Sequence, residues 1–182
     1  VEHIIVDSLE GLPRLRKSKY VQSSISPSLS ITIKKRLLSG SKVLFTGTGC
    51  QVAAIRNFLG RDYENFYACD LICFGVPSPG WYRRYVEKLS QRESEPLVAI
   101  NMRSKHEGWK NYGVCEEYTT KTKFFSVHQS VWSHSFLKKI AHRYSCFVCK
   151  YARLERAGDI TLGDFWGVKN KYPQYDEEDK GT

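Results

Sequence analysis

The stretch over residues 42–59 constrains the fold most, because its apolar pattern changes from that of a strand to that of a helix across one glycine turn. A short apolar run at 43–45 is bounded by turn residues and predicts a buried strand. From Cys50 onward the apolar residues recur on one helical face, and Gly60 follows the last of them as a stop signal. The stretch therefore predicts a strand, a glycine turn and a helix in succession.

The same alternation continues on both sides of this unit. The spacing predicts a helix over residues 28–37, a second buried strand over 66–73 and a helix that begins at Ser78-Pro79. Five apolar residues form the expected inner stripe of that last helix: Trp81, Tyr82, Tyr85, Val86 and Leu89. Alternating strands and helices are typical of an α/β layer with partly parallel strands.

The second half of the chain predicts a different arrangement. Strands are expected over residues 97–103, 112–118 and 124–128, the last two joined as a β-hairpin. Apolar residues near Trp132 mark a further helix that includes Phe136 and Ile140, and residues 159–166 alternate as a strand. We predict an α/β fold: a mixed, partly parallel sheet flanked by helices, with a β-hairpin and cysteine-bearing loops.

The composition is that of a single domain over residues 1–182. Apolar residues make up 41% of the chain and charged residues 26%, which argues against a disordered chain. No apolar run approaches the roughly 20 residues of a membrane span, so none is expected. Because the chain starts at Val1 and stops abruptly at Thr182, we expect a fragment of a longer protein, truncated at both ends.

Positive charge is in excess along the chain. The 28 Lys and Arg residues outnumber the 19 Asp and Glu residues, which gives a net charge of +9. Such an excess is typical of solvated surface, and it also suits an acidic electron carrier or a phosphorylated cofactor. No nucleic-acid-binding motif accompanies the charge, so a nucleic-acid partner is not expected.

Six cysteines are too sparse for a disulfide scaffold and indicate free or metal-bound thiols in a reducing cytoplasm. The spacing of Cys146 and Cys149 is compatible with zinc, a redox disulfide or an iron–sulfur cluster. Cys50 and Cys73 each lie at a turn, 23 residues apart, which is more typical of a cluster held between loops than of a zinc knuckle. The four favour a redox iron–sulfur site, with a zinc-stabilised binding module as the alternative. The other two are expected to be buried in strands: Cys69 and Cys115.

Two further segments carry the residue types of a ligand site. The glycine turn before Cys50 offers backbone amides at a helix N-terminus, which suit a phosphate or a thiolate, but Val52 stands where a dinucleotide fingerprint needs glycine. Arg103, Lys105 and Trp109 place two cations and an indole in one loop. This combination suits phosphate binding and ring stacking, and equally a basic loop with a buried tryptophan.

The remaining polar residues give weaker signals. Asp159 and Asp164 flank a glycine turn, and we expect one to cap the turn and the other to pair with Arg156. The five histidines show no spacing that is typical of metal ligands. We therefore interpret Asp159 and Asp164 as structural residues.

Six motifs occur in order along the chain: Ser18-Lys-Tyr-Val-Gln-Ser23, Gly47-Thr-Gly-Cys-Gln51, Cys73-Phe-Gly-Val-Pro-Ser78, Arg103-Ser-Lys-His-Glu-Gly-Trp109, Cys146-Phe-Val-Cys-Lys-Tyr-Ala152 and Asp159-Ile-Thr-Leu-Gly-Asp-Phe-Trp-Gly167. Together they resemble the beta subunit family of coenzyme F-420 hydrogenases and dehydrogenases. The resemblance runs from about Ser18 to the end of the chain.

Members of that family are iron–sulfur flavoproteins that carry FAD and pass electrons between clusters and a hydride acceptor, which is the deazaflavin F-420 in methanogens. Many bacterial members occur in anaerobes without this deazaflavin. The resemblance implies that four cysteines ligate a 4Fe–4S cluster near the flavin: Cys50, Cys73, Cys146 and Cys149. It implies a cofactor or substrate pocket with these residues: Lys19, Tyr20, Gln22, Ser23, Thr48, Gly49, Arg103, Lys105 and Trp109. It also implies a ferredoxin-like electron donor or partner subunit, and a small-molecule redox substrate.

This chain departs from the family pattern at two positions. The family usually has proline at the position of Gly49, and glycine there loosens the turn without removing a ligand. The family usually has histidine at the position of Phe74, so this chain lacks a proton donor or hydrogen-bonding partner there, which argues against methanogen-like deazaflavin chemistry. The family's N-terminal ferredoxin-like region is expected upstream of Val1.

Overall fold

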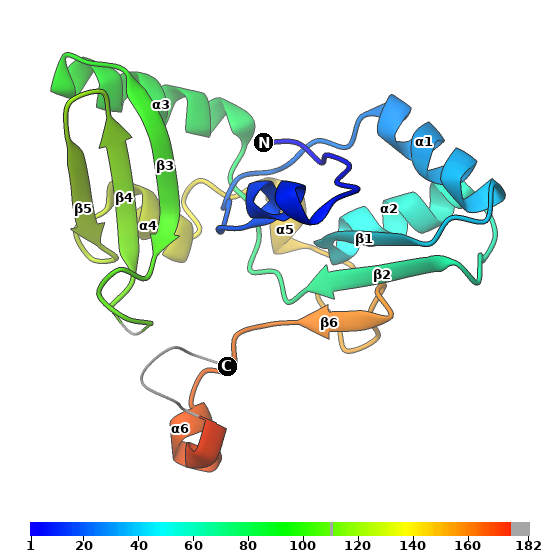
Figure 1. Cartoon of the computed structure of the whole chain (residues 1–182). Helices are drawn as coiled ribbons and strands as arrows, with labels where there is room; N and C mark the ends of the chain where they lie inside the picture. Colours follow the sequence, from blue (N-terminus) through cyan, green and yellow to red (C-terminus); the bar gives the residue numbers. More distant parts are fainter. Residues whose placement is uncertain (110, 176–182) are drawn as a thin grey trace.

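The computed structural model describes residues 1–109 and 111–175 and confirms a mixed α/β fold with cysteine-bearing loops. Its strands form two three-stranded sheets, one parallel in the order β1-β2-β6 and one antiparallel in the order β3-β4-β5. The predicted hairpin is present, and together with β3 it forms a sheet of its own. In Figure 1 the two sheets occupy separate halves of the molecule.

The parallel sheet consists of β1 (Val43–Thr48), β2 (Phe66–Leu71) and β6 (Ile160–Leu162). The two helices predicted from apolar spacing, α1 (Pro27–Leu38) and α2 (Gly49–Leu59), pack on one face of it. The buried residues between helices and sheet are Leu29, Ile33, Leu37, Phe45, Val52, Ile55, Leu59, Phe66 and Ala68. This core fixes the ends of β1 and β2, where two of the predicted site cysteines follow.

The opposite face of the parallel sheet, here called the open sheet face, exposes apolar side chains within residues 1–109 and 111–175. The strand register places five of them on it, each between 46% and 65% exposed: Leu44, Tyr67, Leu71, Ile160 and Leu162. Parallel sheets normally have both faces covered. The open sheet face is therefore suited to contact with a further segment or chain.

The antiparallel half begins with α3 (Pro79–Glu93), which leads into β3 (Leu97–Ser104), β4 (Gly113–Tyr118) and β5 (Thr122–Ser126); α4 (Val131–Leu137) follows. β4 lies in the middle and pairs with both neighbours. A second buried cluster belongs to this half and comprises Val21, Met102 and Trp132, with Tyr20, Tyr82, Tyr85 and Ile100 packed against it.

Several sequence expectations need correction. Trp81 at the start of α3 and Ile140 beyond the end of α4 are exposed and are not core residues. The strand predicted over 159–166 is limited to 160–162, because only these residues pair with β2. Cys69 is buried in β2 as predicted, whereas Cys115 in β4 is half-buried.

The predicted pairing of Arg156 is also wrong. Arg156 pairs with Asp70 in β2, and both Asp159 and Asp164 pair with other arginines. No local pattern indicates these pairs, because the partners come from distant parts of the chain.

Short helical segments complete the fold: η1 (Leu9–Leu15), α5 (Tyr144–Phe147), α6 (Val168–Lys171) and η2 (Pro173–Tyr175). In the described part of the chain, no helix is both long and apolar enough to cross a membrane.

Candidate functional site

The cysteine site, defined as Cys50, Cys73, Cys146 and Cys149, is assembled from three segments. Cys50 lies in the first turn of α2 and Cys73 in the loop after β2. Because β1 and β2 are parallel, their carboxyl ends bring these two cysteines to the same edge of the sheet. Cys146 lies in α5, and Cys149 follows this helix.

The segment that carries the cysteine pair packs against both of the other segments. A Cβ atom placed on Gly75 would lie 3.3 Å from Cβ of Cys146, and one placed on Gly49 would lie 3.5 Å from Cβ of Tyr151. The Gly75 amide also donates a hydrogen bond to Sγ of Cys73 at 3.4 Å. Glycine at position 75 therefore permits a close approach that a larger residue would widen, whereas the Tyr151 contact at Gly49 is of ordinary van der Waals length.

The thiol of Cys73 is electrostatically coupled to the other three. Burial raises its pKa, the Gly75 amide acts in the opposite direction, and the negative charges of the thiolates at Cys50, Cys146 and Cys149 raise it further. The other three cysteines therefore lie within electrostatic reach of Cys73. A bound metal reverses the effect, because it stabilises thiolates.

The cysteine site, as the structure has it, is not arranged around a single metal ion. Across residues 1–109 and 111–175, no group of three or more His, Cys, Asp or Glu side chains is placed to hold one metal ion. A tetrahedral zinc with Zn–S bonds of about 2.3 Å holds its sulfurs roughly 4 Å from one another. In a four-iron cluster each thiolate binds a different iron, so the ligand sulfurs stand farther apart. The separation of the sulfurs therefore distinguishes a cluster from a single ion as the ligand of such a site.

Arg156 connects the segments of the cysteine site. Its guanidinium donates to the carbonyls of Leu71 at 2.8 Å and Tyr151 at 3.2 Å, and Nη2 lies 3.1 Å from Oδ2 of Asp70. Asp70 is 0% exposed and accepts a hydrogen bond of 2.6 Å from the Thr161 hydroxyl. Burial acts to raise the pKa of Asp70, but the Thr161 hydrogen bond and the charge of Arg156 outweigh it and lower the pKa. This ion pair holds β2, β6 and the cysteine-pair segment together.

Three predicted pocket residues, Ser23, Thr48 and Gly49, lie beside Cys50. Oγ1 of Thr48 is 3.1 Å from Sγ of Cys50. The Gln51 side chain accepts from the Thr48 amide at 3.0 Å and donates to Oγ of Ser23 at 2.8 Å. These contacts fix the turn that carries Cys50, so these three residues belong to the surroundings of the cysteine site.

A second region, the arginine cage, consists of Arg103 and four aromatic residues. The guanidinium carbon lies 5.0 Å from the ring centroid of Tyr112, 5.9 Å from that of Trp166 and 6.0 Å from that of Trp109. Nη1 lies 3.4 Å from the hydroxyl of Tyr20. The arrangement places a cation between π-faces, which stabilises its charge.

Arg103 keeps unused hydrogen-bond donors in this cage. Its side chain is 11% exposed, and Nη1 donates to Oδ2 of Asp164. Burial opposes the charge, but the hydrogen bond to Asp164 outweighs it, so the pKa of Arg103 is raised. Nε and Nη2 are buried and have no hydrogen-bond partner among the described residues. Such orphaned donors on a fixed cation suit an anionic ligand. The sequence gives no signal for Tyr112 and Trp166 as members of the cage, although Trp166 lies in the last of the six motifs.

The other predicted pocket residues have different roles. Lys19 is exposed, and its amine donates to two backbone carbonyls of its own loop. The backbone amide of Gln22 donates to the Pro77 carbonyl at 3.3 Å, and the Lys105 side chain is exposed. In the described part of the chain, none of these three side chains hydrogen-bonds Arg103 or a site cysteine.

An aromatic bridge connects the arginine cage with the cysteine site. The Tyr20 ring stacks on Phe136 with centroids 4.6 Å apart, and Phe136 lies 5.0 Å from His142 and 5.6 Å from Phe74. Phe74 directly follows Cys73 in the chain. The sequence predicts Phe136 only as helix core and gives no signal for His142, because this bridge joins residues from distant segments.

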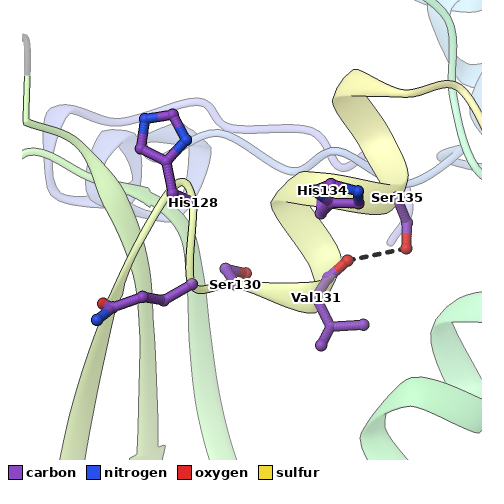
Figure 2. Close-up of a pocket in the computed structure, with 6 residues that line it drawn as sticks. His128, Ser130, Val131, His134 and Ser135 are labelled. Carbon is purple, nitrogen blue, oxygen red and sulfur yellow. Dashed lines mark hydrogen bonds between the residues drawn. The ribbon is translucent and has the colours of Figure 1, made fainter.

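A shallow hollow of about 200 Å³ lies at the start of α4 (Figure 2). Its lining residues are His128, Gln129, Ser130, Val131, His134 and Ser135. Figure 2 shows the Ser135 hydroxyl bonded to the Val131 carbonyl, at 2.8 Å. No predicted site residue lines this hollow, so it is separate from the cysteine site and from the arginine cage.

Residues 40–182 match the family described as the C terminus of the coenzyme F420 hydrogenase/dehydrogenase beta subunit. The chain belongs to this family. The match confirms the resemblance that the sequence motifs carry. No curated protein is significantly similar to the chain.

Membership of the F420 hydrogenase/dehydrogenase beta subunit family gives the full-length protein an oxidoreductase, electron-transfer function within a redox complex. The matched range contains all four members of the cysteine site and the loop from Arg103 to Trp109. Residues 18–23, which supply Tyr20 to the arginine cage, precede the matched range. The fold therefore adds a residue to the cage from outside the matched region.

Proposed function

We propose that this chain is an iron–sulfur flavoprotein module of the full-length oxidoreductase. In this proposal the cysteine site holds a 4Fe–4S cluster and the arginine cage binds FAD or its redox substrate. The aromatic bridge is the observation that carries the proposal, because it joins a four-thiol site to a caged cation within one fold. A bound flavin supplies the exchange of an electron pair with a substrate and of single electrons with a cluster.

The chain's own residues suit the charge of such a cluster. Four thiolates give it a net negative charge, which nearby hydrogen-bond donors stabilise. The Gly75 amide already donates to Cys73, and the charged Arg156 holds the carbonyl of Tyr151 next to the cysteine pair. Cys146 and Cys149 are half-buried, whereas Cys50 and Cys73 are exposed, so the cysteine site lies at the surface of this module.

The arginine cage suits an anionic, planar ligand. Nε and Nη2 of Arg103 offer two fixed donors to a phosphate or carboxylate. The indole of Trp166 is exposed and packs on the buried Trp109, with centroids 4.4 Å apart, so its free face is available for stacking with a flat ring. FAD and a deazaflavin both combine a flat ring with phosphate groups, so the cage suits the cofactor or the substrate.

We further propose that the module meets a partner subunit or a ferredoxin-like electron donor. The open sheet face provides an apolar contact surface, and the net charge of +9 favours an acidic partner. The small-molecule redox substrate is a deazaflavin or another hydride acceptor. Residues 1–182 are proposed as one domain, the C-terminal portion of a longer cytoplasmic protein that binds no nucleic acid.

Replacement of one site cysteine tests the cluster. In the full-length protein, prepared without oxygen, Cys146→Ser should remove about four irons per chain and the matching sulfide, because a serine hydroxyl is a poor cluster ligand. Cys115→Ser, which changes a half-buried cysteine outside the site, is the matched control and should keep all the iron. Equal iron in both variants would contradict the proposal, and a colourless protein with one zinc per chain would favour the zinc-binding module.

Replacement of the caged cation tests the ligand site. Arg103→Gln should weaken binding of FAD or of the phosphate-bearing substrate about tenfold, since a charge-assisted hydrogen bond contributes about 1.5–3 kcal/mol. Lys105→Gln, which removes an exposed cation from the same loop, should change this affinity much less. The measurement is a fluorescence titration of the flavin-depleted full-length protein, with iron content as a check that the fold is intact. Equal affinities for the two variants would exclude Arg103 as a ligand contact.

A further inference from the structure

His142 is held between the two segments that carry Cys73 and Cys146. Its backbone forms an isolated antiparallel bridge with Pro77, and the next amide, that of Arg143, donates to the Val76 carbonyl at 3.1 Å. The chain then enters α5, which contains Cys146. The position of this imidazole is therefore fixed by the same backbone contacts that dock the cysteine-pair segment on the Cys73 loop.

The imidazole of His142 lies among aromatic rings and has no hydrogen-bond partner among the described residues. Its centroid is 5.0 Å from that of Phe136, 5.8 Å from Phe74 and 6.4 Å from Phe147. Both Nδ1 and Nε2 are buried without a partner in the part of the chain that the structure describes. A buried polar atom without a partner costs free energy, so two of them on one ring indicate a missing ligand.

The ring is neutral and so carries one N–H donor. Burial lowers the pKa of His142, and the positive charge of Lys139 lowers it further. A neutral imidazole donates from one nitrogen and accepts with the other, and the environment selects the tautomer. The lowered pKa therefore favours the uncharged imidazole, which has one N–H to donate.

The Cδ2–Nε2 edge of the ring lies against Gly75, next to Cys146. A Cβ placed on Gly75 would lie 2.3 Å from Cδ2 and 2.9 Å from Nε2 of His142, and 3.3 Å from Cβ of Cys146. The amide of the same glycine donates to Sγ of Cys73. Nε2 thus lies at the position where the Cys73 loop and the Cys146 helix meet. Packing among aromatic rings alone would not explain why this nitrogen has no hydrogen-bond partner among the described residues.

We propose that His142 donates a hydrogen bond from Nε2 to a sulfur of the cluster held by the cysteine site and thereby raises the reduction potential of that cluster. The inference rests on the proposed function, since it needs a cluster at this site. An N–H donor stabilises the extra negative charge of the reduced cluster more than the oxidised one. His142 is accordingly a positioning and tuning residue that is not itself a ligand.

The test is a redox titration of the full-length protein, followed by the electron paramagnetic resonance signal of the cluster. His142→Phe keeps an aromatic ring but removes both nitrogens; at a fixed potential it should lower the ratio of reduced to oxidised cluster about tenfold, which corresponds to a midpoint lower by about 59 mV. His142→Gln places an amide N–H near the position of Nε2 and should restore most of the difference. His134→Phe, which removes an imidazole from the hollow at α4, is the matched control and should leave the midpoint unchanged.

The outcomes separate this inference from the function it rests on. A cluster with the wild-type midpoint in His142→Phe would overturn the hydrogen bond while leaving the cluster in place. Loss of iron in a folded His142→Phe protein would also overturn it, because it would make His142 a ligand or a packing element. A wild-type protein without any iron at the cysteine site would overturn both proposals. Exchangeable-proton coupling to the cluster in the wild type, lost in His142→Phe and regained in His142→Gln, would support the inference independently of the midpoint.

Discussion

Replacement of Arg156 with leucine will lower the free energy of unfolding by about 3 kcal/mol, because it leaves the carboxylate of Asp70 buried without a cation to pair with. Asp70 is 0% exposed, and its only cation in the described part of the chain is Arg156. Removal of one member of a buried ion pair typically costs about 3–5 kcal/mol. The lower value applies here, since the side chain of Arg156 is itself 21% exposed.

The same substitution should also empty the cysteine site. Arg156 donates to the carbonyl of Leu71, two residues before Cys73, and to that of Tyr151, two residues after Cys149. Without the guanidinium these two segments lose their shared anchor. We therefore expect Arg156→Leu to lose bound iron even under conditions where most of the protein stays folded.

The measurement is urea unfolding of the full-length protein together with its iron content. Arg153→Leu is the matched control, because this neighbouring arginine is exposed, and it should change neither quantity by more than a small amount. The double variant Asp70→Asn with Arg156→Leu removes the buried charge and should regain part of the stability but not the iron. An Arg156→Leu protein as stable as the control would show that water reaches Asp70 and that the ion pair is dispensable.

The elements of this fold could be predicted where the signals are local. The Ser26 and Ser78 hydroxyls accept hydrogen bonds from amides three residues ahead, and Gly60 is left-handed after the last turn of α2. Each of these signals acts within a few residues, and so the starts of α1 and α3 and the end of α2 follow from the sequence. The positions of Cys50 and Cys73 at the ends of neighbouring strands follow for the same reason.

The contacts that build the site could not be predicted, because they are non-local. Arg103 meets Tyr20, and Phe136 meets the ring of His142, only after two sheets have formed and packed. Phe74 is an instructive case: the sequence suggests that the site lacks an imidazole there, yet the structure places His142 in edge contact with that ring. A motif therefore indicates the cysteines of the site but not the side chains that surround them.

The second large effect concerns Gly75, where alanine should both destabilise the chain by about 3 kcal/mol and remove the proposed cluster. Gly75 has a φ of +116°, a conformation that costs an alanine about 1–3 kcal/mol. The added Cβ would lie 2.3 Å from Cδ2 of His142, so the imidazole or the backbone must move. Overpacking of this kind costs a further amount of about 1–3 kcal/mol.

Gly60→Ala separates the two causes, because Gly60 also has a positive φ, +75°, but nothing within 4 Å of an added Cβ. That control should lose only about 1 kcal/mol and keep its iron. If the collision with His142 is what opens the cysteine site, then His142→Ala should relieve part of the effect of Gly75→Ala in the double variant, measured by unfolding and iron content. If the losses of stability and iron from the two substitutions are instead additive, strain in the Cys73 loop alone disrupts the site. The imidazole can then move aside without separating Cys73 from Cys146.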